Sequence, residues 1–345
     1  MATVRTRTLA ERLGTATASC PDVESLSRAV FGAVRRHVPF VFACLATTDP
    51  ASELITAAYK SHPLPMGDED FAAAEYGRPD VNQLAEIARR PVPVGVLSID
   101  TGGEVGRCRR LRDYMTPAFG FTDELRLVCR ARGAVWGALA LYRGEGGPPF
   151  TTREADELAG VHELLADGVR RTLFAPPAAH AAPTCGAAVL VVDDTDRVTD
   201  MTATVPRQID DLGGWDHGSL PANVLSVVAL ARASREPART RVLGRHGRWL
   251  ALHAMPLDGG SGARSVVVTV DVAAPAAVGE LALAARGLTA REQDVARLVL
   301  QGASTKVIAA SLHLSPHTVQ DHLKAVFDKL GVSSRRELIA QLVLA

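Results

Sequence analysis

Apolar residues near the C-terminus recur at every third or fourth position, which predicts short amphipathic helices. Between positions 316 and 330 they share one side of a helix: Val319, Leu323, Val326 and Leu330. The opposite side is polar, with Gln320 at its border: His317, Asp321, Lys324 and Asp328. This segment is therefore predicted to be a helix with one buried side and one solvent-facing side.

Capping residues mark the starts of four such helices. In chain order they are Thr289 with Glu292, Ser304, Ser315 followed by Pro316, and Ser334 with Glu337. Gly302 and Gly331 follow the first and third helices, where a left-handed residue commonly ends a helix. The inward-facing residues predicted for the other three helices are Val295, Leu298, Val299, Ile308, Leu312, Leu338, Ile339 and Leu342.

The second and third of these helices form a helix-turn-helix pattern. A short helix and a tight turn precede a helix that begins sharply at Pro316. In this arrangement the second helix enters the major groove of DNA with its N-terminal residues at base edges. The nearby histidines His313, His317 and His322 are not predicted to bind a metal, because His313 precedes the turn and His322 lies near the edge of the core.

Residues 288–342 resemble the DNA-binding domain of LuxR-type transcription regulators. The matching positions are Leu288, Thr289, Arg291, Glu292, Gly302, Ile308, Ala309, Leu312, Ser315, Thr318, Val319, His322, Lys329, Leu330 and Arg335. Val307 stands where the family usually has Glu, so the second helix lacks a capping-box partner. Ala296 replaces a usual Leu and leaves the first helix with a smaller core residue.

The resemblance implies which residues contact DNA. It places Gln320, Asp321 and Lys324 at base edges, where lysine can donate to guanine and glutamine can pair with adenine. Three partners are open for Asp321: a cytosine amino group on DNA, or Lys324 or His317 before binding. Phosphate contacts are expected from Ser304, Thr305, Lys306, His317, Thr318 and Arg335. Residues 288–345 carry seven Lys/Arg and five Asp/Glu, a net charge of +2. This modest charge predicts weak nonspecific affinity for DNA.

The resemblance also implies partners. These are double-stranded DNA with an inverted-repeat operator, a second copy of the chain in a homodimer or higher symmetric oligomer, and RNA polymerase. In this family the last helix commonly pairs two DNA-binding domains, which gives Leu338 and Leu342 a role at a dimer contact. Their alternative role is in the core of the domain itself.

The N-terminal region mixes helices and strands in an order that resembles a GAF domain, a small-molecule sensing module. The predicted elements are a helix at 25–37, strands at 40–48 and 54–61, a hairpin of 124–130 with 135–142 turning at Arg132 and Gly133, and a helix at 152–173. That last helix has an apolar stripe of Leu158, Val161, Leu165 and Val169. The stripe fits equally well against the helix's own sheet or at a dimer seam.

The middle region begins with "VLVVDDTDRV", which resembles the opening of a phosphate-accepting receiver domain. A receiver also needs a third Asp after a later parallel strand and then a Lys, yet the chain has no lysine between Lys60 and Lys306. We therefore predict a hairpin of strands 189–192 and 198–201. A helical stretch and three further strands follow, an order that resembles a PAS-like fold.

Pro- and Ala-rich joints divide the chain. The predicted organisation is a GAF-like domain at 1–174, a linker at 175–186, a PAS-like domain at 187–272, a linker helix at 273–287 and the DNA-binding domain at 288–345. The fold class is accordingly multidomain: two α+β domains and an all-α four-helix domain of LuxR type.

Composition fits an ordinary globular protein, with 47% hydrophobic residues, 22% charged residues and no net charge. Neutrality argues against a protein that coats nucleic acid along its whole surface. The cysteines are odd in number and lack CxxC spacing, which predicts reduced thiols: Cys20, Cys44, Cys108, Cys129 and Cys185. With no apolar signal core and no membrane-length apolar run, the expected location is cytoplasmic.

These patterns predict a sequence-specific DNA-binding transcriptional regulator, not an enzyme, whose N-terminal region senses a small molecule or mediates dimerisation. One alternative is a phosphorylation-controlled response regulator, and another is an enzyme carrying a DNA-binding domain. The first lacks the acceptor site, and for the second the sequence shows no GxSxG, P-loop, HExxH or dinucleotide fingerprint. No cofactor is identified. The strands "FVFACLA" and "VWGALALY" favour an apolar or aromatic ligand in a GAF-like pocket. A cyclic nucleotide, a lipid-like acid and a haem all remain open as ligands.

Overall fold

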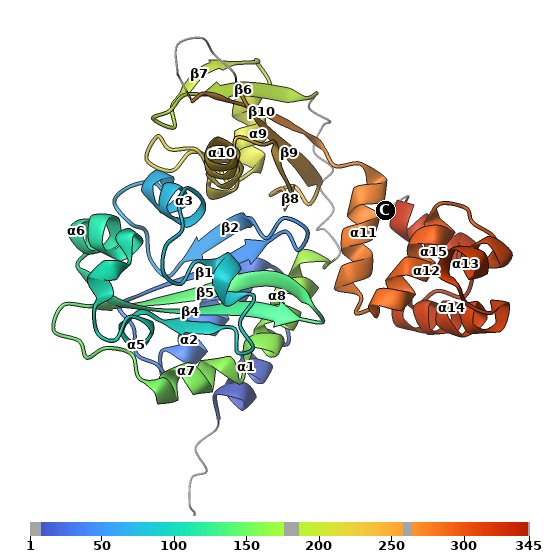
Figure 1. The fold of residues 1–345 in the computed structure, drawn as a ribbon, viewed down its shortest axis with the longest axis horizontal. Coiled ribbons are helices and arrows are strands. Elements are labelled where there is room, and N and C mark those ends of the chain that lie inside the picture. Colours follow the sequence, from blue (N-terminus) through green and yellow to red (C-terminus); the bar gives the residue numbers. More distant parts are fainter. Residues whose placement is uncertain (1–7, 176–185, 258–263, 344–345) are drawn as a thin grey trace, which may run out of the picture. The chain divides into compact units, whose positions relative to one another are not determined.

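The computed structural model describes residues 8–175, 186–257 and 264–343. The chain forms two compact units, Met1–Val272 and Ala273–Ala345 (Figure 1). Most of the predicted linker at 175–186, with Cys185, lies outside the described residues.

The first unit contains two antiparallel sheets. The strands of the first sheet are β1 (Phe42–Thr48), β2 (Ile55–Lys60), β3 (Val94–Val96), β4 (Phe121–Ala131) and β5 (Ala134–Gly144). Their order across the sheet is β2-β1-β5-β4-β3. The β4–β5 hairpin matches the prediction, and its turn uses positive φ at Arg132 and Gly133.

Helices flank this sheet. Helices α1 (Leu9–Thr17) and α2 (Val23–Val34) pack on each other and on α8 (His162–Leu173), which packs on β4 and β5. Helix α7 (Thr152–Ala159) packs on β3 and β4. Between β2 and β4 the chain forms α3 (Glu69–Tyr76), α4 (Leu84–Ile87), α5 (Leu97–Asp100), η1 (Val105–Arg107), η2 (Arg110–Met115) and α6 (Thr116–Phe119).

The predicted single helix at 152–173 was wrong, because the chain breaks into α7 and α8 at Gly160 and Val161. Val161 has φ −120° and ψ 7°, outside the helical region, so the hydrogen-bond ladder does not continue through it. The apolar stripe of this segment is buried inside its own unit, with Leu158 and Val169 at 0% exposure. The stripe is therefore core and not a dimer seam.

The second sheet repeats the order of the first. Its strands are β6 (Ala188–Val192), β7 (Val198–Met201), β8 (Ala238–Leu243), β9 (Trp249–Pro256) and β10 (Val266–Val272), arranged β7-β6-β10-β9-β8. Two helices, α9 (Val205–Asp211) and α10 (Ala222–Ser234), lie between β7 and β8 in the chain. β6 and β7 pair antiparallel as predicted, so Asp193 lies in a hairpin turn and not at the end of a parallel strand.

Helix α10 joins the two sheet regions (Figure 1). It contacts β8, β9 and β10 of the second sheet and also α3 and β2 of the first region. The Asn223 side chain donates to the carbonyl of Thr56 in β2 at 3.0 Å and to that of Leu212 at 2.8 Å. A helix that is apolar on all sides is usually buried on all sides, which explains the composition of "ANVLSVVALARAS".

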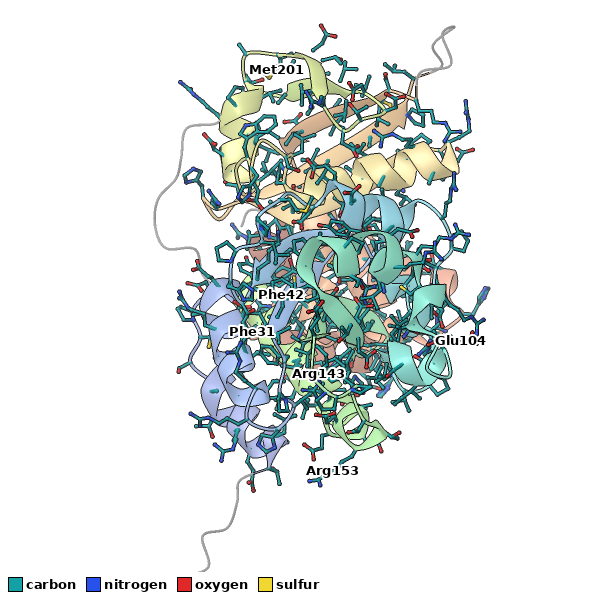
Figure 2. The ribbon with its side chains drawn as sticks, turned by 90° about the vertical axis from the view of Figure 1, so that its left-hand side faces the viewer. Phe31, Phe42, Glu104, Arg143, Arg153 and Met201 are labelled. Atoms are coloured by element: carbon teal, nitrogen blue, oxygen red, sulfur yellow. The ribbon has the colours of Figure 1, made fainter. Side chains whose placement is uncertain are left out.

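Further contacts make the two sheet regions one unit. Leu54 and Ala72 of the first region belong to the hydrophobic cluster around the second sheet. An ion pair joins Asp49, just after β1, to Arg241 in β8 at 2.6 Å. Figure 2 labels Phe42, which is buried on β1, and Met201, which is exposed on β7.

The second unit is helical. It consists of α11 (Pro275–Ala285), α12 (Ala290–Leu300), α13 (Thr305–Leu312), α14 (Pro316–Leu330) and α15 (Arg335–Val343). The range predicted as a linker helix holds α11, which packs on α12 and α15, with Leu283 in the shared core. Ala296, the smaller core residue, is fully buried in the same cluster.

The predicted caps are present, with one shift of position. Thr289 and Glu292 form a capping box, and the Ser304 and Ser315 hydroxyls accept from the third backbone N–H of their helices. At α15 the Ser334 hydroxyl accepts from the backbone N–H of Glu337. The Glu337 carboxylate reaches back to the N–H of Ser333, not to that of Ser334, which corrects the predicted capping box by one residue.

Candidate nucleic-acid interface and apolar cavity

Helix α14 has one buried side and one polar side, as predicted. Val319, Leu323, Val326 and Leu330 are at most 2% exposed. Gln320, Asp321 and Lys324 are exposed on the other side. The helix begins at Pro316 after the Ser315 cap and ends at Gly331, which has φ 66°. The caps satisfy the end groups of the helix, so it can present its N-terminal turns to a partner without fraying.

The starts of α13 and α15 meet the polar side of α14. The Gln320 amide donates to the Thr305 hydroxyl at 3.4 Å. Arg335 donates to the same hydroxyl at 3.3 Å and to the carbonyl of Ala303 at 2.8 Å. Three of the predicted DNA-contacting residues are thus held together although they come from three helices.

The other predicted contact residues surround this group. Ser304 and Lys306 are exposed at the start of α13, and Thr318 is half-buried in the first turn of α14, where its hydroxyl lies 2.8 Å from that of Ser315. Among the described residues, neither Lys306 nor Lys324 forms an ion pair. Both ammonium groups therefore face solvent.

Asp321 has a local partner. Its carboxylate lies 3.1 Å from Nδ1 of His317, one turn earlier in α14. The sequence left three partners open for Asp321: a cytosine amino group, Lys324 or His317. In the free protein the partner is His317.

The histidines of this unit do not form a metal site. Within the described part of the chain, no three His, Cys, Asp or Glu side chains come together as metal ligands do. His313 serves a structural role, since it takes the left-handed conformation that ends α13.

The two candidate dimer residues lie on α15. Leu338 is fully buried in the core of its own unit, which assigns it to the second of the two roles considered for it. Leu342 lies in the last turn of the helix, among positions whose side chains are outside the described part.

An apolar cavity of about 60 Å³ lies on the first sheet. Alternate residues of a strand point to one face, and two neighbouring strands supply six side chains to its wall: Phe42, Cys44, Ala46, Ala138, Ala140 and Tyr142. These belong to the two strands from which an apolar pocket was predicted. Helix α10 adds Ala222 and Ser226, which are one helical turn apart.

Charged residues border this cavity. Lys60 Nζ lies 2.9 Å from the Asp68 carboxylate and 3.5 Å from that of Asp216. Burial alone would lower the pKa of Lys60, but the neighbouring Asp68 carboxylate raises it above its usual value. The ammonium group therefore stays charged beside an otherwise apolar wall. This role of Lys60 was not predicted from the sequence, although Lys60 is the only lysine before Lys306.

A buried ionic network reaches the cavity wall through Arg126 and Tyr142. Arg126 Nη1 lies 2.6 Å from Glu75, and Arg126 Nε lies 2.9 Å from Glu124. Glu124 also accepts from Arg110 and, at 2.6 Å, from the Tyr142 hydroxyl. Burial alone would raise the pKa of Glu124, but the two arginine charges lower it to about 2. In the sequence, the signal of this network was the spacing by two of Glu124 and Arg126 on a predicted strand, which places both side chains on one face.

Cys44 lies on the cavity wall as an unreactive thiol. Burial raises its pKa to about 12. Since the thiolate is the nucleophilic form, Cys44 acts as a small apolar residue. Cys20, Cys108 and Cys129 are also free thiols.

A capped turn between a short helix and a helix with an exposed polar side defines a helix-turn-helix DNA-binding domain. The family model for bacterial regulatory proteins of the luxR family matches residues 286–342. Spore germination protein GerE of Bacillus subtilis is 39% identical over 56 residues, which cover 16% of this chain and 76% of GerE. The chain therefore belongs to the LuxR family of bacterial regulatory proteins through this domain.

Longer alignments are found with mycobacterial regulators. The transcriptional regulatory protein NarL of Mycobacterium tuberculosis is 26% identical over 202 residues, 52% of this chain and 89% of NarL. An HTH-type transcriptional regulator of Mycobacterium bovis is 28% identical over 253 residues, 65% of this chain. The chain spans only 28% of the length of that second relative.

Solved structures align only weakly. The photosensory core module of a Stigmatella aurantiaca phytochrome gives a TM-score of 0.34 at 13% identity, covering 48% of this chain and 36% of that one. The phage VqmA–DPO complex gives 0.25 at 20% identity, covering 45% and 80%. No helix in the described ranges has the length and apolar character needed to cross a bilayer.

Proposed function

We propose that this chain is a sequence-specific DNA-binding regulator of transcription that catalyses no reaction. The observation that carries the proposal is the exposed polar side of α14, which starts at a capped turn and is linked through Gln320 to the start of α13. With α14 in the major groove, Gln320, Asp321 and Lys324 face base edges. Asp321 then exchanges His317 for a cytosine amino group.

The residues around α14 are proposed to hold phosphates. Ser304, Thr305 and Lys306 stand at the start of α13, where backbone N–H groups and the helix dipole favour an anion. Arg335 faces the same hydroxyl of Thr305, and His317 and Thr318 lie in the first turn of α14. Contacts of this kind position the protein on the duplex and do not select the sequence.

The first unit is proposed to be the sensory part. Each of its sheets has the strand order second-first-fifth-fourth-third, consistent with a GAF-like region at 1–174 and a PAS-like region at 187–272. The apolar cavity gives the first region a place for a small molecule. The hairpin at Asp193 gives no support to a phosphorylation-controlled regulator.

The functional state is proposed to be a symmetric dimer in the cytoplasm, on an inverted-repeat operator, from which it acts on RNA polymerase. Two identical helix-turn-helix domains related by a two-fold axis meet two half-sites of opposite orientation. The base-reading side of α14 remains exposed for that purpose.

Selection from a pool of random duplexes by the full chain tests the proposal. We expect one sequence family to be enriched, and replacement of Gln320, Asp321 and Lys324 by Ala together to abolish the enrichment. Asp328→Ala, on the exposed side of the same helix but near its C-terminal end, is the matched control and should still enrich the family. The proposal would be contradicted if the bound duplexes shared no common sequence, or if the triple variant enriched the same sequence family equally well.

A further inference from the structure

The polar groups along the apolar cavity are nearly all engaged within the protein. Arg126 is bonded to Glu75, Glu124 and the carbonyl of Asn82. The Tyr142 hydroxyl donates to Glu124, and the Ser226 hydroxyl donates to the carbonyl of Ala222 at 2.7 Å. Each of these groups is already bonded within the protein, and the charge of Arg126 is matched by Glu75 and Glu124, so they restrict what the cavity accepts without attracting charge.

The pair of Lys60 and Asp68 is different. An ammonium group has three donors, and Asp68 and Asp216 use two of those of Lys60. The Asp68 carboxylate has two oxygens, of which Oδ1 pairs with Lys60. The Lys60–Asp68 pair therefore offers one donor and one acceptor side by side while carrying no net charge. Asp216 does not line the cavity, and its side chain is 48% exposed, so water screens its charge.

A charged ligand would find no unpaired charge of opposite sign in this cavity. An ion would have to leave water for a wall of Phe42, Ala46, Ala138 and other apolar side chains, beside a charge pair that is already neutral. A hydroxyl or amide on an apolar body gains a bond from Lys60 or to Asp68 without that cost.

Helix α10 completes the wall from the other sheet region. Ala222 and Ser226 face the cavity, while Val227 and Val228 of the same helix belong to the core of the second sheet. Asn223 fixes this helix to β2. A molecule in the cavity thus touches a helix whose other sides are packed in the second region.

From these contacts we infer that the cavity binds a small uncharged molecule with an apolar or aromatic body and one hydroxyl or amide group held by Lys60 and Asp68, and that α10 is part of its binding site. The inference rests on the sensory role proposed for the first unit. It makes the second sheet region necessary for ligand binding, because the first region alone lacks the wall formed by Ala222 and Ser226.

The lysine content of the chain allows a direct test of ligand class. The chain has four lysines, Lys60, Lys306, Lys324 and Lys329, so incorporation of ε-¹³C-lysine into the full chain gives four side-chain signals and leaves every ammonium group with its three donors. Lys60→Arg identifies the Lys60 signal by its loss. The probes are benzyl alcohol, benzoate and benzylamine, which share one ring and differ in charge.

We expect benzyl alcohol to shift the Lys60 signal saturably while the other three signals stay in place. Benzoate and benzylamine should bind at least tenfold more weakly. No saturable shift of Lys60 up to the solubility limit of benzyl alcohol, or an equal response to either charged probe, would overturn the inference.

A second pair of variants tests whether α10 forms part of the cavity wall that contacts the ligand. Ser226→Leu extends α10 into the cavity and should weaken benzyl alcohol binding at least tenfold, whereas Ser226→Ala should bind like the original chain. Ala222→Leu replaces Ser226→Leu if that variant does not fold. Unchanged binding by the folded Leu variant would show that α10 does not border the ligand.

This experiment separates the inference from the proposed function. Binding of the enriched duplex by the same samples without probe reports on DNA recognition alone. A chain that binds its duplex but shows no Lys60 response contradicts the ligand inference, and a chain that responds to benzyl alcohol but binds no duplex contradicts the proposed function.

Discussion

The ammonium group of Lys329 lies 2.6 Å and 2.8 Å from the two carboxylate oxygens of Glu292. This ion pair ties the last turn of α14 to the first turn of α12, where Glu292 also accepts from the backbone N–H of Thr289 in the capping box. Glu292 is 6% exposed. The pair therefore fixes the helix proposed to read DNA to the helix on which it packs.

Lys329→Met is expected to lower the free energy of unfolding of the second unit by about 1–2 kcal/mol, because a hydrogen-bonded charge on Glu292 loses its partner. Hydrogen exchange of amides in α12 and α14 measures this. Lys324→Met, on the same helix but without a partner among the described residues, is the control and should stay within about 0.5 kcal/mol.

The same pair predicts a dependence on pH. Burial alone would raise the pKa of Glu292, but hydrogen bonds from Lys329 and Thr289 hold it below its usual value. The stabilisation is present above the pKa of glutamate in an unfolded chain, about 4.3. It is lost as pH falls through the lower pKa of the folded state. The Lys329→Met variant and the original chain should therefore converge in stability below that pH; a difference that persists or grows there would refute this origin.

Val307→Glu is expected to stabilise the second unit by about 0.5–1 kcal/mol. Val307 is 51% exposed at the third position of α13, and its backbone N–H already donates to the Ser304 hydroxyl. A carboxylate there can bond back to the N–H of Ser304 and complete a capping box. Thermal unfolding measures the gain, and Val307→Ala is the control for helix propensity and for loss of the exposed valine. An equal gain from Val307→Ala would mean that removal of the valine, and not the new carboxylate, stabilises the unit.

Arg126→Leu is expected to destabilise the first unit by about 3–5 kcal/mol, because it leaves Glu75 and Glu124 buried with too little positive charge. The variant should melt at lower temperature or fail to accumulate as folded protein. Arg112→Leu removes an exposed arginine paired with Asp113 and should leave the stability nearly unchanged, because water screens that pair. A similar loss of stability in both variants would mean that burial of the network adds little to the cost of removing Arg126.

The sequence predicted the second unit well because its signals are local. An N-cap side chain bonds to a backbone N–H only three residues later, so the starts of α12, α13 and α14 follow from Thr289, Ser304 and Ser315. The break between α7 and α8 at Val161 was missed, since its apolar spacing continues the helical period across the break.

The cavity could not be predicted in full because its wall combines distant segments. The strands that carry Phe42 and Ala140 were expected to line a pocket. Ser226 lies more than 80 positions beyond Ala140 in the chain and reaches the cavity only because α10 packs on both sheet regions. Similarly, nothing in the spacing of Glu75 and Arg126 indicates that they form an ion pair.

The full chain is expected to bind an inverted repeat as a two-fold symmetric oligomer, with half-sites about one helical turn or less apart. The fragment 273–345, which has its own core and caps, should still bind DNA but with lower affinity. Analytical ultracentrifugation with footprinting measures both properties. A monomer that protects a single half-site, or a folded fragment with no affinity for the operator at low salt, would contradict the proposed assembly.

The most direct test of the account compares Lys324→Ala with Lys306→Ala on the selected operator and on single-base-pair variants of it, at two salt concentrations. Lys324→Ala should cost roughly 1–3 kcal/mol and relax the preference at one base pair per half-site, because it removes a contact to a base edge. Lys306→Ala should weaken all sequences alike and lower the salt slope by about one, because it removes a contact to phosphate. A uniform loss for Lys324→Ala with a sequence-dependent loss for Lys306→Ala would contradict the proposed orientation on DNA. Changes within about 0.5 kcal/mol for both would show that neither lysine contacts DNA.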